Sequence, residues 1–334
     1  MTRRRRPHRS GQRNQQEIVD NSHLPADVVS GDRITGVVVT RYGANLDVED
    51  DQGTIHRCTS RRKLSGIVTG DRVIWQAGEH GTGIVLEYLP RETLLTRPDD
   101  LGREKPVAAN IDQIVVVSVA RSSKESGYVL NHNLIDRYVV AAENLGVKPL
   151  LLFNKIDLLT GEERARLEAD VQVYQAITYR CLLTSTKTGE GMAQLADELG
   201  DHTSIFVGES GVGKSSLIDT LLPNHALRIG EVSAGSGKGQ HTTTATRLYP
   251  LPSRGRLIDS PGVREFGLGR CTSDEAAYGF IEFRPLFGQC KFHNCGHIAE
   301  PGCAVKAAVA SGQIHRRRYE NYIEIVQSLA KSHP

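Results

Sequence analysis

The sequence predicts three structured parts in order: a small all-β barrel, an α/β domain with a mostly parallel sheet, and a mostly helical segment containing cysteine and histidine. Three observations indicate this order. Residues 31–98 are short alternating runs between turn residues, residues 99–268 alternate strand-like runs with helical patterns, and residues 269–334 contain a Cys/His cluster. Alternation with period two is typical of half-buried strands, and strands alternating with helices are typical of a parallel sheet.

The composition is that of an ordinary globular protein. With 334 residues, of which 39% are hydrophobic and 24% charged, the chain is long enough for two or three domains. The net charge of +2 gives no general argument for nucleic-acid binding. No apolar run reaches the ~18 residues of a membrane span, and no apolar segment follows the basic N-terminus as in a secretory signal. We therefore expect a cytoplasmic protein with reduced thiols and no membrane contact. We also expect a monomer.

Residues 1–30 are rich in Arg, Gln and Asn, so we expect a basic disordered arm that either keeps the chain soluble or contacts RNA. Residues 31–98 contain five strand-like runs: RITGVVVTRY, ANLDVED, TIHRCTS, DRVIWQ and TGIVLEYL. Five short strands at ~8–12-residue spacing favour the five-stranded OB-type barrel, which commonly binds nucleic acid. The alternative is a small β-domain used only for packing.

The strand candidates of residues 99–268 are DQIVVVSVA, KPLLLFNK, RCLLTST and TSIFVGE. The run LNHNLIDRYVVAAENL has apolar residues at helical spacing, with Gly146 just past its end. This alternation predicts a mostly parallel sheet with helices on both faces.

GESGVGKSS at residues 208–216 matches the phosphate-binding loop pattern in full. The strand-like run TSIFV precedes it and the helical pattern KSSLIDTLL follows it, as such a loop requires. Backbone N–H groups would bind the phosphates, Lys214 would reach the β- and γ-phosphates and support catalysis, and the Ser215 hydroxyl would bind Mg²⁺. The predicted phosphate-site residues are Gly208, Glu209, Ser210, Gly211, Val212, Gly213, Lys214, Ser215 and Ser216.

NKID at residues 154–157 indicates which base is bound. The Asp157 carboxylate can accept from the ring N–H and the exocyclic amine of guanine, and adenine has no such donor pair. Two such bonds at ~1.5–3 kcal/mol each would discriminate against adenine by ~10²–10⁴. A four-residue match alone could be a solvated turn, but a second lysine-containing segment follows the next strand. The residues predicted to contact guanine are Asn154, Lys155, Asp157, Ser185, Thr186 and Lys187.

The run RGRLIDSPG ends in a further GTPase element. Asp259 would hold Mg²⁺ through water, and the Gly262 amide would contact the γ-phosphate. In the Gly- and Thr-rich stretch GSGKGQHTTTATRLY, we choose Thr243 over its neighbouring threonines as a catalytic residue and a magnesium ligand beside Ser215 and Asp259.

The order of these elements is a rotation of the usual GTPase order. Here the guanine loop comes first, followed by the second guanine contact, the phosphate loop, the threonine loop and DxxG. A rotation preserves the sheet, because it joins neighbouring chain ends and opens the chain elsewhere. The sequence therefore predicts a circularly permuted P-loop GTPase domain.

Three cysteines and one histidine lie close together near the C-terminus, at Cys290, Cys295, His297 and Cys303. Three thiolates and an imidazole suit a closed tetrahedral structural zinc site. His293 is a rival ligand, and reduced cysteines packed beneath a loop are the alternative to a metal. The predicted cofactors are one structural Zn²⁺ and the Mg²⁺ that accompanies GTP.

The combined pattern resembles the ribosome-small-subunit-dependent GTPases, which are bacterial circularly permuted GTPases of late 30S assembly. The resemblance covers residues 31–325 and rests on NLIDRYVVAAE, NKIDL, GESGVGKSSL, GQHTTT, IDSPGVREFGL and CKFHNCGH…EPGCAVKAAV. It implies an N-terminal OB-fold, a permuted GTPase domain and a C-terminal zinc-binding domain. It also implies that the partner is the small subunit with its ribosomal RNA, and that the subunit stimulates a slow hydrolysis of GTP to GDP and phosphate.

Val263 follows Gly262, where many GTPases have a glutamine that orients the attacking water. Valine cannot do this. The resemblance favours His241 as the catalytic group, since an imidazole with a pKa of ~6.5 can orient or deprotonate water. The alternative is that the ribosome supplies the catalytic group. Gly211 stands where potassium-dependent GTPases have asparagine, so a potassium requirement is not indicated.

Two other functions are weighed against this one. An adaptor with a vestigial nucleotide site is disfavoured because the phosphate and magnesium residues are intact, and an ATP-dependent enzyme is disfavoured by Asp157. The helical pattern after the Cys/His cluster includes Arg316, Arg317 and Arg318, which we expect to be available for phosphate contacts.

Overall fold

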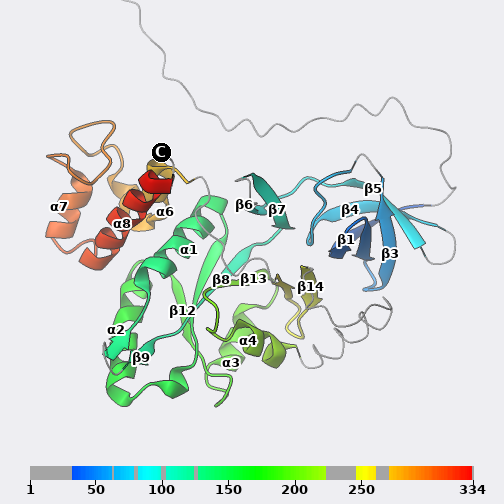
Figure 1. Ribbon diagram of the computed structural model, residues 1–334, viewed down its shortest axis with the longest axis horizontal. Helices are drawn as coiled ribbons and strands as arrows, with labels where there is room; N and C mark the ends of the chain where they lie inside the picture. The colour runs from blue at the N-terminus through cyan, green and yellow to red at the C-terminus, as the bar shows by residue number, and fades with distance from the viewer. Residues whose placement is uncertain are drawn as a thin grey trace, which may run out of the picture.

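Three bodies make up the computed structural model (Figure 1). A barrel (blue to cyan) and a group of C-terminal helices (orange to red) lie on either side of a central α/β domain. The structure describes residues 32–61, 64–78, 82–98, 103–123, 127–222, 246–260 and 271–332. The predictions for the arm at residues 1–30 and for His241, Thr243 and Gly262 lie outside these residues.

Five strands form the N-terminal barrel: β1 (Arg33–Tyr42), β2 (Asn45–Glu49), β3 (Ile55–Ser60), β4 (Arg72–Ala77) and β5 (Thr82–Tyr88). They lie in the order β1-β2-β3-β5-β4, and β4 pairs again with β1 to close the barrel. Only the β3–β5 pair is parallel among these pairings. The predicted five-stranded barrel is therefore confirmed. Its strands form from the alternating runs because alternation places the apolar side chains of each strand on one face.

The barrel interior is filled around Trp75, which is 1% exposed. Gly83 lies opposite this ring. A Cβ at Gly83 would lie 2.6 Å from Sγ of Cys58 and 2.8 Å from the Trp75 ring. The glycine in TGIVLEYL is therefore needed for the close approach of the indole.

Six strands form the sheet of the α/β domain: β8 (Gln113–Ser118), β11 (Lys148–Phe153), β12 (Arg180–Leu183), β13 (Thr203–Val207), β14 (Arg247–Pro250) and β15 (Arg256–Asp259). Their order is β12-β11-β8-β13-β15-β14, and all neighbours are parallel except β14 and β15. Thr40 of β1 pairs with Arg247 of β14, which links the barrel to this sheet.

The chain order of the strands is rotated about β13, the strand that leads into GESGVGKSS. On one side of β13 lie β8, β11 and β12, which precede it in the chain, and on the other lie β15 and β14, which follow it. The strand of the predicted guanine loop, β11, therefore comes earlier in the sequence than the strand of the phosphate loop. This is the arrangement that the rotated motif order predicts.

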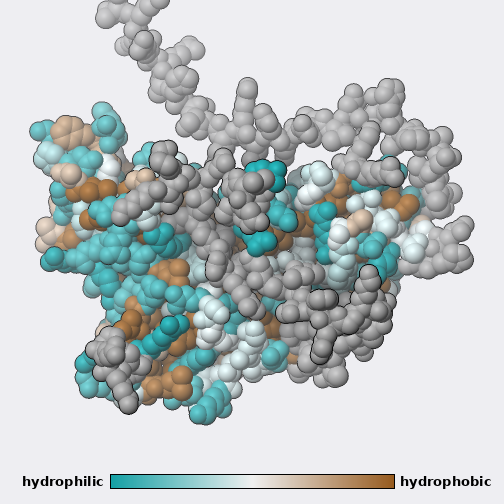
Figure 2. All heavy atoms as spheres, in the orientation of Figure 1, coloured by the Kyte–Doolittle hydropathy of each residue, from teal (hydrophilic) through white to brown (hydrophobic). Residues whose placement is uncertain are grey.

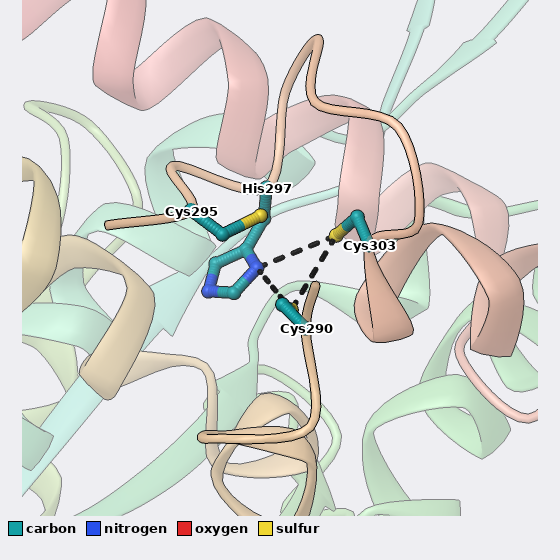
Figure 3. Close-up of side chains that lie close together, drawn as sticks. All are labelled: Cys290, Cys295, His297 and Cys303. Atoms are coloured by element: carbon teal, nitrogen blue, oxygen red, sulfur yellow. Dashed lines mark hydrogen bonds between the residues drawn. The ribbon is translucent and has the colours of Figure 1, made fainter. Parts of the chain in front are cut away.

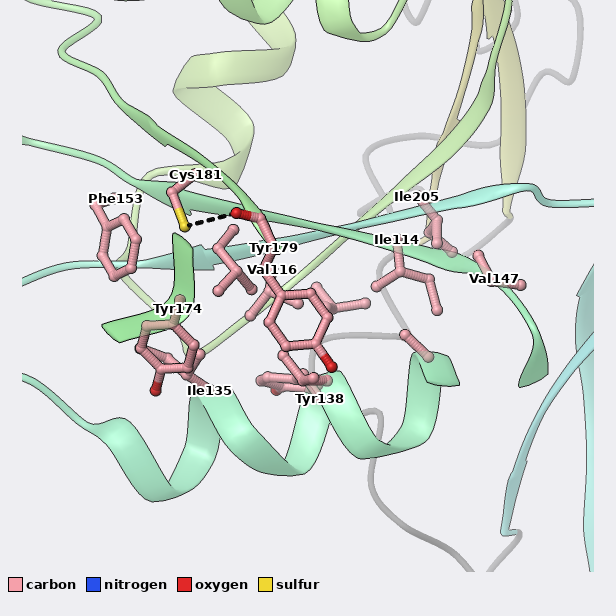
Figure 4. Close-up of a cluster of buried hydrophobic side chains, with 14 of the residues drawn as sticks. Ile114, Val116, Ile135, Tyr138, Val147, Phe153, Tyr174, Tyr179, Cys181 and Ile205 are labelled. Carbon is pink, nitrogen blue, oxygen red and sulfur yellow. Dashed lines mark hydrogen bonds between the residues drawn. The ribbon is translucent and has the colours of Figure 1, made fainter. Parts of the chain in front are cut away.

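Helices cover both faces of the sheet. On one face α1 (His132–Leu145) and α2 (Gly161–Ala176) bury Ile135, Tyr138 and Tyr174 against the strands (Figure 4). On the other, α3 (Met192–Glu198) and α4 (Lys214–Leu221) bury a second cluster. Because both faces are covered, β8 and β11 are continuous apolar runs.

Local capping explains where α1 begins and ends. The side-chain oxygen of Asn131 accepts from the backbone N–H of Leu134 at the start. Gly146 ends the helix with φ 70°, the left-handed conformation that glycine adopts most readily. The position of this glycine in the sequence predicts the boundary.

The C-terminal segment contains α6 (Ser273–Gly279), a short 3-10 helix η4 (Ile281–Leu286), α7 (Ala304–Ala310) and α8 (Arg316–Ser332). The rings of Phe283 and Tyr322 meet edge to face with centroids 5.1 Å apart. Val140 of α1 belongs to the same buried cluster. The segment therefore shares its core with the α/β domain.

Two short hairpins are not predicted by the sequence. One is β6 (Leu94–Pro98) with β7 (Glu104–Ala109), and the other is β9 (Arg121–Ser123) with β10 (Gly127–Val129). Within the described ranges, no helix combines the length and the apolar character needed to span a bilayer. Figure 2 shows hydrophobic residues in separate small groups among hydrophilic ones on the face that it presents.

Candidate nucleotide and metal sites

The predicted phosphate loop joins the carboxyl end of β13 to the N-terminus of α4. Gly208 has φ 142° and Gly213 has φ 97°. A Cβ on Gly208 would lie 2.2 Å from the carbonyl oxygen of Val117, and one on Gly213 would lie 2.5 Å from Nδ2 of Asn154. These two glycines therefore allow the loop to lie against both β8 and the predicted guanine loop.

Lys214, the first residue of α4, reaches back over the loop. Its ammonium group donates to the carbonyl oxygens of Gly208 at 2.6 Å and Glu209 at 2.7 Å. Three hydroxyl side chains are exposed in the loop and the first turn of the helix, those of Ser210, Ser215 and Ser216. A positive charge, the hydroxyls and the N-terminus of α4 together suit a bound phosphate chain.

The predicted guanine loop is hydrogen-bonded directly to the phosphate loop. Nδ2 of Asn154 donates to the carbonyl oxygen of Val212 at 2.9 Å, and Nζ of Lys155 donates to the carbonyl oxygen of Gly211 at 2.7 Å. Val212 is 2% exposed, so its side chain packs beneath the loop and only its backbone can face a ligand. Asn154 and Lys155 therefore tie the predicted guanine loop to the phosphate loop.

Asp157 lies in the short 3-10 helix η2 (Ile156–Leu158). Its Oδ1 atom accepts from the hydroxyl of Ser185 at 2.6 Å, and Nζ of Lys187 lies 4.0 Å from Oδ2. The Asp157 side chain is 11% exposed. A hydroxyl and an ammonium group on the next loop therefore orient the carboxylate that is predicted to accept from guanine.

One positioning residue is missed by the sequence analysis. Thr184 is fully buried, and its hydroxyl donates to Oδ1 of Asn154 at 3.2 Å. This contact fixes the amide so that its nitrogen faces the phosphate loop. The only signal in the sequence is that Thr184 immediately precedes Ser185 and Thr186 in the run RCLLTST. Thr186 is half-buried beside them.

The predicted magnesium residues Ser215 and Asp259 come from neighbouring elements. Asp259 ends β15, which pairs in parallel with β13, so its end reaches the same edge of the sheet as the phosphate loop. Ser215 lies in the first turn of α4, directly after that loop. Carboxylate and hydroxyl oxygens are ligands that Mg²⁺ prefers, so these two residues fit the ion. The third predicted ligand, Thr243, lies outside the described residues.

Cys290, Cys295, His297 and Cys303 meet in one cluster of the C-terminal segment (Figure 3). Their candidate ligand atoms all lie within 4.8 Å of one another. Cys290 and Cys295 are half-buried, whereas His297 and Cys303 are buried. The rival ligand His293 is exposed and is not part of this group.

The cluster has the dimensions of a tetrahedral zinc site. Sγ of Cys290 lies 3.9 Å from Sγ of Cys303, and these atoms lie 3.5 Å and 3.4 Å from Nδ1 of His297. Zn–S bonds of ~2.3 Å and Zn–N bonds of ~2.0 Å require separations of about 3.8 Å and about 3.5 Å. Burial lowers the pKa of His297 and so favours the neutral imidazole that binds a metal. The four side chains can therefore hold Zn²⁺.

The three consecutive arginines of α8 do not share one environment, and the expectation that all are available for phosphates is wrong. Arg316 is 84% exposed and pairs with Glu320. Arg317 pairs with Asp170 of α2, and only 25% of its side chain is exposed. Arg318 is 1% exposed. Consecutive helical residues point about 100° apart, so one of the three faces water while the others pack inward.

Comparisons with known proteins agree with this fold and site. The sequence matches the family model of the RsgA GTPase over residues 88–269, more than half of the chain. The small ribosomal subunit biogenesis GTPase RsgA of Haemophilus influenzae (strain PittEE) is 46% identical over 311 residues, which span 92% of this chain and 88% of that protein. The protein of the same name from Pseudomonas putida (strain F1) is 47% identical over 300 residues, with 89% and 86% covered.

Two solved structures have the same architecture. The crystal structure of YjeQ from Thermotoga maritima has a TM-score of 0.73 and 30% identity, covering 89% of this chain and 99% of that one. YloQ, described as a circularly permuted GTPase, has a TM-score of 0.71 and 27% identity, covering 91% and 97%. The predicted permutation is thereby confirmed. The chain belongs to the RsgA GTPase family and is an enzyme that hydrolyses GTP.

Proposed function

We propose that this GTPase binds the small ribosomal subunit and its rRNA and couples GTP hydrolysis to late maturation or checking of that subunit. In this proposal the subunit stimulates hydrolysis, and the protein acts as a monomer in the cytoplasm. The observation that carries it is a guanine loop hydrogen-bonded to a phosphate loop in a chain 46% identical to a small-subunit biogenesis GTPase over 92% of its length.

Each predicted site residue has a role in this proposal. Asp157, oriented by Ser185, selects guanine, and Lys155 lies along the base. Lys214 binds the phosphates, and the exposed hydroxyl of Ser215 is available to the metal. Mg²⁺ would neutralise the charge that develops on the phosphates. The remaining assignments are the phosphate-loop backbone for the phosphates, Asp259 and Thr243 for Mg²⁺ and Gly262 for the γ-phosphate.

The water-orienting group is assigned to His241, with Thr243 beside it in the catalytic set. Val263 cannot orient water, so either this imidazole or a group of the subunit must do so. Subunit stimulation follows naturally in both cases, because a group that is fixed or supplied only on the subunit makes hydrolysis slow in its absence.

The domain division 31–98, 99–268 and 269–334 gives the subunit two surfaces to bind, one on each side of the GTPase domain. On the barrel, the Arg57 guanidinium lies 5.8 Å from the Tyr42 ring, and its side chain is 60% exposed. Arg91 lies 4.8 Å from the Tyr88 ring but is held by Asp71, so here the tyrosine ring is the group available to RNA. Tyr88 is 41% exposed. Aromatic faces beside arginines suit stacking on bases and contact with phosphates, so we assign the barrel to rRNA.

Co-sedimentation with purified 30S subunits tests the partnership. The protein should pellet with 30S subunits in a non-hydrolysable GTP analogue and do so less in GDP, because hydrolysis is proposed to end the bound state. The 50S subunit serves as the matched control. Equal pelleting with both subunits in both nucleotides would contradict the proposal.

A further inference from the structure

Asn131 makes two hydrogen bonds that belong to different parts of the molecule. Its side-chain oxygen accepts from the N–H of Leu134 at 3.1 Å, which caps helix α1. Its side-chain nitrogen donates to Oε1 of Glu209, the second residue of the phosphate loop, at 3.1 Å. Ser, Thr and Asp can also cap helices. An ionised Asp, however, has no proton to donate to Glu209, whereas the amide of Asn131 has one. The N-cap of α1 therefore also holds the phosphate loop.

Glu209 is held at further points. Nη2 of Arg121, in β9, lies 3.6 Å from its other carboxylate oxygen, Oε2. Its backbone carbonyl accepts from Nζ of Lys214 at 2.7 Å. The same residue is thus bonded through its side chain to α1 and through its backbone to the lysine that binds phosphates in the proposed function. A shift of the phosphate loop at Glu209 cannot leave Asn131 in place without breaking one of these bonds.

The N-terminal half of α1 is bound to α8. Asp136 is fully buried and accepts from Arg318 and from Nδ2 of Asn321, the latter at 2.5 Å. Nδ2 of Asn133 donates to Oε2 of Glu324 at 2.8 Å. These contacts lie within two turns of Asn131, so a movement of the N-terminal half of α1 also moves α8.

Helix α8 in turn holds the loop of the Cys/His cluster. The hydroxyl of Tyr319 donates to the carbonyl oxygen of His297 at 2.8 Å, and that of Tyr322 donates to the carbonyl oxygen of Gly296 at 2.7 Å. A cavity of about 420 Å³ marks where the parts meet. Its lining includes Asn131 and Glu209 together with Arg317 of α8.

We propose that Asn131 is a positioning residue for the phosphate loop. Through Asn131, nucleotide binding changes the stability of α1, of α8 and of the zinc loop, residues 290–303. This deepens the proposed function, because it names the route by which the nucleotide site and the proposed subunit-binding segment affect one another. Coupling of this kind is reciprocal in binding free energy. The connection runs from the phosphate loop through α1 and α8 to the loop of the Cys/His cluster.

A charge swap tests the first half. Asn131→Asp keeps the helix cap but places a carboxylate against Glu209. The dissociation constant for GTP should therefore rise about threefold to tenfold, because the free energy lost lies between that of an exposed hydrogen bond and that of a hydrogen bond to a charged group. Adding Glu209→Gln should bring the dissociation constant back to within about twofold of the wild type, because the introduced amide can donate to the introduced carboxylate. Asn144→Asp, which adds the same charge at an exposed position near the C-terminal end of α1, should stay within about twofold of the wild type. Loss of affinity that Glu209→Gln fails to rescue, or an unchanged affinity in Asn131→Asp, overturns the assignment.

Hydrogen exchange tests the second half with the same full-length proteins and no subunit. Amides of residues 290–303 and of α8 should exchange differently in a GTP analogue and in GDP in the wild type. Asn131→Asp should remove most of that difference, and Asn131→Asp/Glu209→Gln should restore it. Identical exchange in the two nucleotides in the wild type, or an undiminished difference in Asn131→Asp, overturns the coupling. Because no subunit is present, these results stand apart from those that test the proposed partnership.

Discussion

Arg318 of α8 donates to the carboxylate of Asp136 of α1, and the two side chains are 1% and 0% exposed. Glu282 lies beside them, with its Oε1 atom 2.8 Å from Nε of Arg318. Burial disfavours the charge on the arginine, but the two carboxylates outweigh this effect and raise the pKa of Arg318 well above its ordinary value. A buried ionic cluster therefore joins the C-terminal segment to the GTPase domain.

Removing one partner of this cluster should be costly. Asp136→Ala leaves the buried guanidinium with a single carboxylate, so we expect the free energy of unfolding to fall by about 3–5 kcal/mol. Arg316→Ala is the matched control, because its exposed ion pair with Glu320 should contribute less than about 1 kcal/mol. Urea unfolding of the two variants measures the difference. Equal stabilities would show that the buried cluster does not hold the segment in place.

Base selection should depend on Asp157. Asp157→Asn reverses one hydrogen-bond polarity toward guanine, and xanthine reverses it back. We therefore expect GTP affinity to fall by ~10²-fold or more and xanthosine triphosphate to become the preferred nucleotide. Competition between the two nucleotides for the variant measures this. Unchanged guanine preference would remove Asp157, and the Ser185 contact that orients it, from the base site.

Replacing a residue of the Cys/His cluster should remove the zinc that we expect there and lower stability. Cys295→Ala should abolish stoichiometric zinc and lower the thermal midpoint by roughly 5–10 °C, because the loop anchors α8 and α8 packs on α1. Cys271→Ala, a half-buried thiol outside the cluster, should keep its zinc. Metal analysis and thermal unfolding of both variants test this. Full zinc in Cys295→Ala would sink the ligand assignment.

Replacing His241 distinguishes whether this residue or the ribosome supplies the catalytic group. In His241→Ala we expect GTP affinity within a few-fold of the wild type and subunit-stimulated turnover lower by ~10²–10⁴, the usual contribution of general acid–base catalysis. Single-turnover hydrolysis with saturating 30S subunits measures the effect. Unchanged stimulated turnover would assign catalysis to a group of the subunit.

Local patterns in the sequence predict most of this molecule. Alternation predicts the barrel strands, and the glycines of GESGVGKSS predict the loop that lies against its neighbours. What the sequence does not predict depends on partners far away in the chain. Asn131 is an ordinary helix cap until the fold brings Glu209 to it, and Thr184 is an ordinary buried threonine until Asn154 is placed beside it.

For the three arginines of α8, the sequence predicts a phosphate-binding surface that the structure does not have. HRRRYENY has the composition of a phosphate-binding patch, yet Arg318 is buried and Arg317 is committed to Asp170. Helical geometry alone separates neighbouring residues by about 100°, so a run of three cannot share one exposed face. Which of the three points inward depends on the packing of α8 against α1, and no local pattern specifies that.

In the proposed function, the small subunit switches on a GTPase that is slow alone. Its most direct test is GTP turnover by the wild type and by Lys214→Ala with and without purified 30S subunits, with subunits alone as the background. We predict a stimulation of roughly 10²-fold, the size expected when a partner fixes or supplies one missing transition-state contact, and no turnover above background in Lys214→Ala. Equal turnover with and without 30S subunits, or equal stimulation by 50S subunits, would contradict the account.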